Sequence, residues 1–195
     1  MIEIDGVAYP RVSEILTATG LGWTGWSQGP SRERAAALGT AVHKACELDA
    51  AGRLDEASVH PEVRPGLDGY RAFVRETQHK AIASEHRLLH PAWGYVGHLD
   101  RVGTLGRLPT VLIDWKFTDH PDLWAARFQL AAYWRLWNDT HPEAPVSSVF
   151  VVQLRKNGTF ALHDLTAEAQ AAEQTFFAAV LVWKALQERE TRGGR

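Results

Sequence analysis

Helical segments are indicated by apolar residues at helical spacing and by start and stop signals around them. The predicted helices cover residues 10–19, 32–51, 61–81 and 121–140, and a last one starts near 166 and fades before the polar tail at 190. Pro10 and Ser31 are typical of helix starts, and Gly20 and Gly52 follow the ends of the first two helices. The chain therefore has a substantial helical part.

Strand patterns occur in three groups, each bounded by glycine or proline. The first is a short hairpin within residues 1–9, around Asp5-Gly6. The second group holds three successive strands, and the third holds two strands with Asn157-Gly158 in the turn between them. These five strands are predicted over 83–90, 94–103, 110–118, 147–155 and 159–165.

The order of these elements predicts one mixed α/β domain over residues 1–195. Residues 1–30 would form the hairpin, a short helix and a glycine-rich loop. Residues 31–190 would form the core and the last helix, and 191–195 a polar tail. A chain of 195 residues is long enough to bury a full hydrophobic core.

The composition is that of a soluble globular protein, with 45% apolar and 23% charged residues. A formal net charge of −2 means that any nucleic-acid partner would need a local basic patch. The single cysteine, Cys46, excludes an internal disulfide and a four-cysteine metal site, and it fits a reducing cytoplasm. The N-terminus is no signal peptide, and the longest apolar run, 176–183, is too short to span a bilayer.

The stretch 111–118 places two charged residues, Asp114 and Lys116, at the end of an apolar strand. Residues two apart on a strand share a face, so these side chains lie next to each other. Asp100, on the preceding strand, comes close to Asp114 if the two strands form an antiparallel hairpin. Paired carboxylates suit Mg²⁺ or Mn²⁺, and a lysine beside the cation could orient a water or stabilise a phosphate. The alternative is a surface ion pair between Asp114 and Lys116.

The first long helix carries His43 and Glu47 four residues apart, hence on one face. The imidazole suits Mn²⁺, although a buried or capping histidine is the alternative. Gly39, one turn earlier, is costly inside a helix and indicates that this part of the helix approaches something closely.

Three further residues could complete a site. Gln129 and Tyr133 share a face of the helix after the Asp114 strand and could position a phosphate or a base, or they lie at the edge of the core stripe. Glu85, on the strand before Asp100, is either another acidic group of the cleft or a solvent-facing residue.

Taken in order, these residues resemble a known set of motifs. The set comprises Gly39, His43, Glu47, Glu85, Gly97, Asp100, Asp114-Trp115-Lys116, Gln129 and Tyr133. It resembles the RecB-like branch of the PD-(D/E)XK nuclease superfamily, which includes stand-alone phage and mitochondrial exonucleases. The segment 9–21 also resembles the N-terminal lead-in of those exonucleases, with Arg11 in place of their serine. The matching motifs span about half of the chain.

The resemblance implies a restriction-endonuclease-like core, with a mixed central β-sheet flanked by helices. It implies Mg²⁺ or Mn²⁺ held by His43, Asp100, Asp114 and the backbone carbonyl of Trp115, with Lys116 as the catalytic lysine. Asp100, Asp114, Gln129 and Tyr133 would complete the catalytic group, with Glu47 and Glu85 as accessory residues. Asp114 replaces the glutamate of many superfamily members, and the lone Cys46 argues against the iron–sulfur cluster of some relatives.

Contact with DNA would require positive charge and stacking faces near this site. Arg32, Arg34 and Lys44 lie on the His43 helix or at its start, and Trp23 and Trp26 lie in the loop before it. The loop could close over a strand, or its tryptophans could cover one end of the core.

The sequence therefore predicts a metal-dependent deoxyribonuclease, as an exonuclease in DNA processing, recombination or repair in a phage or cellular role. Its partner would be DNA, as a single strand or as the ends of a duplex, with no membrane contact. Two alternatives remain: a nuclease-fold module that binds nucleic acid without cleaving it, and a metal-dependent enzyme that acts on a small molecule.

Overall fold

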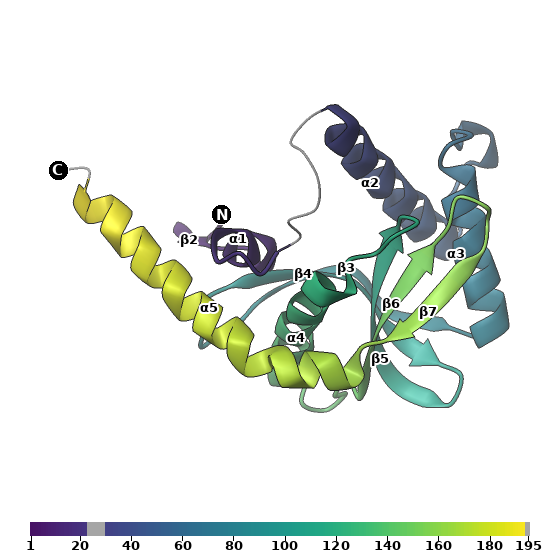
Figure 1. The fold of residues 1–195 in the computed structure, drawn as a ribbon. Helices are drawn as coiled ribbons and strands as arrows, with labels where there is room; N and C mark the ends of the chain where they lie inside the picture. The colour runs from purple at the N-terminus through teal and green to yellow at the C-terminus, as the bar shows by residue number, and fades with distance from the viewer. Residues whose placement is uncertain (23–29, 194–195) are drawn as a thin grey trace.

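The computed structural model describes residues 1–22 and 30–193, and the side chains of residues 30–32 and 190–193 fall outside what it describes. The elements in chain order are β1 (Ile2–Ile4), β2 (Val7–Tyr9), α1 (Val12–Ala18), α2 (Pro30–Ala50), a 3₁₀ turn (Glu56–Ser58), α3 (Arg64–Thr77), β3 (Lys80–Leu89), β4 (Val96–Leu105), β5 (Leu108–Phe117), α4 (Leu123–Thr140), β6 (Ser148–Leu154), β7 (Phe160–Asp164) and α5 (Thr166–Gly193). They form one α/β unit with a mixed central sheet flanked by helices (Figure 1).

The central sheet has five strands in the order β3-β4-β5-β6-β7, and β1 and β2 form a separate hairpin. Strands β3, β4 and β5 are an antiparallel meander, and β6 and β7 are an antiparallel pair. Between these two parts, β5 and β6 run parallel. Parallel neighbours need a crossover connection, which α4 supplies.

Helices cover both faces of the sheet (Figure 1). Helices α2 and α3 pack on one face, against side chains that include Val111, Ile113 and Trp115 of β5. Helices α1, α4 and α5 pack on the other face, against residues that include Leu112. Asp114 follows the same alternation and projects toward α4, as a two-residue strand period requires.

Strands β4 and β5 part where the two aspartates lie. Their ladder ends at the pair Arg101–Ile113. From Asp114 to Phe117, β5 is paired with β6 and no longer with β4. Beyond that point the Trp115 N–H donates to the Asp100 carboxylate, with 2.9 Å between nitrogen and Oδ2. A side chain thus replaces the missing backbone partner and opens the sheet next to both carboxylates.

Three predicted helix ends were wrong. Helix α3 ends at Thr77 and not at 81, because Gln78 turns left-handed with φ of 55° and β3 begins at Lys80. Helix α5 runs to Gly193, because the Glu and Arg residues of the tail are good helix formers and a polar composition does not by itself end a helix. Helix α2 begins at Pro30, so Ser31 lies inside it.

No helix in residues 1–22 or 30–193 combines the length and the apolar character that a membrane crossing requires.

Candidate metal centre

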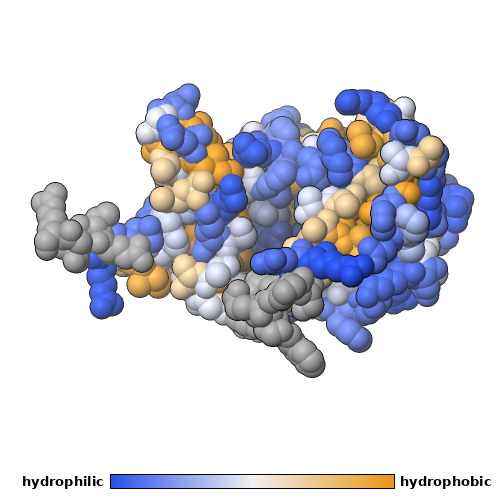
Figure 2. Space-filling view, turned by 90° about the horizontal axis from the view of Figure 1, so that it is seen from above, coloured by the Kyte–Doolittle hydropathy of each residue, from blue (hydrophilic) through white to orange (hydrophobic). Residues whose placement is uncertain are grey.

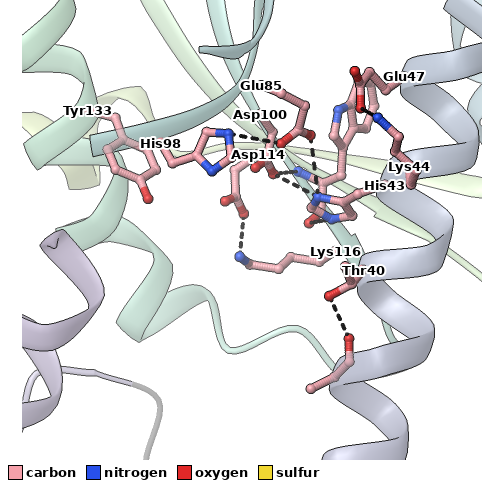
Figure 3. A network of polar contacts seen from close by, with 12 residues as sticks. Thr40, His43, Lys44, Glu47, Glu85, His98, Asp100, Asp114, Lys116 and Tyr133 are labelled. Carbon is pink, nitrogen blue, oxygen red and sulfur yellow. Dashed lines mark hydrogen bonds and ion pairs between the residues drawn. The ribbon is translucent and has the colours of Figure 1, made fainter. Parts of the chain in front are cut away.

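Three side chains from three elements converge at the opening in the sheet. His43 comes from α2, Glu85 from β3 and Asp100 from β4, and one ligand atom of each lies within 4.8 Å of the others (Figure 3). The His43 Nδ1 atom lies 3.7 Å from Asp100 Oδ2 and 3.9 Å from Glu85 Oε1. Seen from above, the surface is hollowed between the part that carries α2 and α3 and the part that carries α1 and α5, and both hydrophilic and hydrophobic residues border the hollow (Figure 2).

The hydrogen bonding of His43 decides which ring nitrogen faces the carboxylates. The Nε2 atom lies 3.0 Å from the carbonyl oxygen of Trp115, which can only accept. Nε2 therefore carries the proton, and the lone pair of Nδ1 faces Glu85 and Asp100 in the neutral ring. The electrostatic interaction between this lone pair and two negatively charged carboxylates is repulsive unless a cation or a second proton lies between them.

Glu85 reaches this group through an unusual backbone conformation. It is a non-glycine residue within β3, yet its φ is 47°. Such left-handed residues cost free energy and occur often at functional sites. The strand register places Glu85 opposite Asp100, between the pairs Ser84–Arg101 and His86–Leu99. Burial and the Asp100 charge raise the pKa of Glu85 above its usual value.

A second group, Asp114 with Lys116 and Gln129, lies directly beside the first. Asp114 is 2% exposed, and its Oδ1 accepts a hydrogen bond from Gln129 Nε2 at 3.0 Å. Its Oδ2 is paired with Lys116 Nζ at 2.7 Å, but within the described residues no donor completes a well-directed hydrogen bond to this oxygen. Burial raises the pKa of Asp114; the Lys116 charge opposes that change, and Asp100 adds to it.

Lys116 keeps its positive charge in this setting. Burial alone lowers its pKa, but the carboxylates of Asp114 and Asp100 more than offset that effect, so the pKa is raised. Gln129 holds the pair in place: its Oε1 lies 3.5 Å from Lys116 Nζ, and its Nε2 also reaches Tyr133 Oη at 3.3 Å. Burial raises the pKa of Tyr133, so its phenol stays neutral.

This donor set fits a divalent cation. An imidazole and two carboxylates converge, and the buried carboxylate of Asp114 keeps one oxygen without a directed donor. Carboxylate oxygens together with an imidazole nitrogen are ligands that divalent cations accept. The residues that converge differ in part from the expected ligands. Glu85 was expected only as an accessory residue, but its carboxylate lies with His43 and Asp100. Asp114 was expected as a ligand, and its carboxylate is paired with Lys116. The Trp115 carbonyl, an expected ligand, accepts from His43.

The other residues singled out in the sequence lie outside this group. Lys44 and Glu47, which follow His43 on α2, form an ion pair with 2.7 Å between nitrogen and oxygen. Arg34 forms an exposed ion pair of the same length with Glu62. Trp23, Trp26 and the side chain of Arg32 lie outside the described residues.

Two neighbours of the site were missed in the sequence. His98 Nε2 lies 3.2 Å from Glu85 Oε2, and its place two residues before Asp100 on the same strand was the signal for it. Arg101 is 2% exposed, with its guanidinium carbon 5.8 Å from the Tyr70 ring centre and 5.9 Å from that of Trp115. A buried arginine of this kind leaves no sequence signal.

No protein-family model and no curated protein matches this chain. Among solved structures, the chain is similar to a candidate exonuclease from Eubacterium rectale at 11% identity, over 85% of this chain and 69% of that one, with a TM-score of 0.45. It is also similar to an alkaline exonuclease from Laribacter hongkongensis at 13% identity, over 96% and 95% of the two chains, with a TM-score of 0.37. The complex of that enzyme with dAMP gives 14% identity over the same shares, with a TM-score of 0.35.

Proposed function

We propose that this protein is a metal-dependent nuclease that hydrolyses phosphodiester bonds in DNA, acting as an exonuclease in DNA processing, recombination or repair in the cytoplasm. The observation that carries the proposal is the His43, Glu85 and Asp100 group, placed beside the buried Asp114–Lys116 pair at the opening between β4 and β5. The choice of DNA and of strand ends rests on the ordered motifs from Gly39 to Tyr133.

The acidic residues and the histidine would hold Mg²⁺ or Mn²⁺. His43, Glu85 and Asp100 offer converging ligand atoms, and Asp114 offers its Oδ2 atom next to them. When bound, such an ion lowers the pKa of a coordinated water and polarises a phosphoryl oxygen. His43 is oriented by its bond to the Trp115 carbonyl, the kind of second contact that fixes a metal-binding imidazole.

Lys116 would act as a fixed positive charge. Its raised pKa keeps the ammonium protonated, so we assign it the stabilisation of negative charge on the phosphate and not the removal of a proton. Asp114 and Gln129 hold the ammonium in place, which reduces the reorganisation needed during the reaction. No covalent intermediate is required, because water is the nucleophile.

The test is digestion of single- and double-stranded DNA, labelled at the 5′ or the 3′ end in separate reactions, with Mg²⁺, with Mn²⁺ and with EDTA. We expect cleavage from ends that stops with EDTA and falls by at least about 10²-fold in Asp100→Asn. The matched control is Glu143→Gln, which removes an exposed carboxylate from the loop that follows α4. DNA that stays intact at high protein and Mn²⁺ concentration, or binds without being cut, would contradict the proposal.

A further inference from the structure

Gly39 lies in the interior of α2, one turn before His43. A glycine in the middle of a helix destabilises it relative to alanine, because it has more conformational freedom to lose on folding. A Cβ built at Gly39 has no atom of the described residues within 4 Å. The described part of the chain thus offers no packing reason for this glycine.

The other glycines whose surroundings the structure describes all have a local reason. Some adopt a positive φ, and the rest lie against neighbours that a Cβ would press on. The Cβ would come 2.6 Å from a Val42 methyl at Gly66, 2.8 Å from the Thr159 carbonyl oxygen at Gly69, and 2.6 Å from a Leu136 methyl at Gly97. Gly39 has neither reason among the described residues, and the space beside it is open there.

The open side of Gly39 belongs to the flank of α2 that leads to the metal centre. Residues four apart share a helix face, so Gly39 precedes His43 by about 6 Å along the helix axis. The Thr40 hydroxyl bonds back to the Ala36 carbonyl at 3.0 Å and so stays close to the helix. Figure 3 shows Thr40 and His43 on α2, with Lys116 and Asp114 across from them.

We propose that this flank of α2 receives the sugar–phosphate backbone of the DNA strand as it enters the metal centre, and that Gly39 is the positioning residue that lets the strand lie against the helix. The inference rests on the proposed nuclease function and adds the path of the strand. A phosphate bound between His43 and Lys116 has its neighbouring nucleotide within one helical turn, which is the distance from His43 to Gly39. A side chain at position 39 would hold that nucleotide away from the helix and displace the scissile phosphate.

The test compares Gly39→Ala and Gly39→Leu with Ala41→Leu. Ala41 is exposed on the same helix, two residues on and about 200° around the axis, so it adds equal bulk to the opposite flank. Each variant is assayed on a single-stranded oligonucleotide and on the p-nitrophenyl ester of thymidine 5′-phosphate, which is too short to follow α2. Melting temperatures are measured in parallel.

We expect Gly39→Ala to raise the melting temperature by about 1–4 °C, because it removes the helix cost of glycine. It should raise the KM for the oligonucleotide by about tenfold, and Gly39→Leu by more, while the small ester is cleaved at the wild-type rate. Ala41→Leu should leave both substrates unchanged. A change with the oligonucleotide alone would indicate that the strand is displaced from α2. Damage to the metal centre would instead slow the cleavage of both substrates.

Two results would overturn the inference while leaving the nuclease function intact. One is an unchanged oligonucleotide KM in both Gly39 variants. The other is a lower melting temperature in Gly39→Ala, which would mean that the packing of the chain itself requires the glycine. A wild-type protein that cleaves neither substrate would instead refute the nuclease function on which the inference depends.

Discussion

At the scale of single residues, the site depends on charges that are stable only in pairs. Asp114 is nearly fully buried, and an unpaired carboxylate at that position is strongly unfavourable. Lys116 offsets its charge at 2.7 Å, and Gln129 donates to the other oxygen. The same pair thus supports both the fold and the proposed chemistry, and variants can separate the two roles.

We predict that Lys116→Met lowers the free energy of unfolding by about 1–3 kcal/mol at pH 7, because it leaves Asp114 without its cation. The range allows for the third of the Lys116 side chain that is exposed to solvent. Burial already raises the pKa of Asp114, and loss of Lys116 raises it further, so the carboxyl protonates more easily and the loss of stability shrinks as the pH falls toward 4. Urea unfolding at both pH values measures this.

The double variant Asp114→Asn with Lys116→Met should recover most of the lost stability, because both charges of the pair are removed together, yet stay inactive on DNA. Lys156→Met is the control, since its ion pair with Asp119 is exposed and worth little. If the double variant were as unstable as Lys116→Met, the penalty would come from lost packing and not from the unpaired carboxylate.

We also predict a pH effect from His79, the residue that directly precedes β3. Burial lowers the pKa of His79 to about 4, and its Nδ1 lies 2.7 Å from the Thr104 carbonyl oxygen. The unfolded chain binds a proton to this histidine near its usual pKa of about 6.5, so the fold loses stability as the pH falls from about 6.5 toward 4. The loss attributable to His79 at pH 5 is about 2 kcal/mol.

Urea midpoints of the wild-type protein and of His79→Phe at pH 7 and pH 5 measure this contribution. The variant should lose clearly less stability between the two pH values than the wild-type protein. Parallel losses in both proteins would mean that His79 is not held neutral in the fold.

At the scale of elements, the periodicity of the sequence predicted the helices and strands, while their ends depended on single residues. The end of α3 could not be read from periodicity, because Gln78 adopts a left-handed conformation without being a glycine. The strand period placed Asp114 and Lys116 on one face, as the structure has them. It could not identify Glu85 as a neighbour of His43, because that position depends on a local φ of 47° that no residue pattern encodes.

Close packing of α3 against the β6–β7 turn gives a prediction for this element. A Cβ at Gly69 would lie 2.8 Å from the Thr159 carbonyl oxygen, a backbone atom that can move only with the turn. We therefore expect Gly69→Ala to lower the free energy of unfolding by about 1–3 kcal/mol, despite the better helix propensity of alanine. Urea unfolding measures it, and Asp68→Ala, next to it on the helix, serves as the control. A Gly69→Ala protein as stable as the wild-type protein would show that the turn yields without cost.

At the scale of the whole molecule, the arrangement of the sheet creates the site. The meander β3-β4-β5 and the parallel partner β6 leave β4 and β5 free to separate at Asp100 and Asp114. Helix α2 closes the opening from one side with His43, and α4 from the other with Gln129. The element order in the sequence indicated one mixed α/β domain, but the separation of the two strands depends on long-range register, which a local pattern does not encode.

The central claim is that residues from three separate elements form one metal site that serves DNA cleavage, and calorimetric titration with Mn²⁺ tests it most directly. We predict saturable binding to the wild-type protein, and binding at least about tenfold weaker in Asp100→Asn and in Glu85→Gln, with Glu143→Gln unchanged. Absence of saturable binding to the wild-type protein, or equal affinity in all four proteins, would contradict the account.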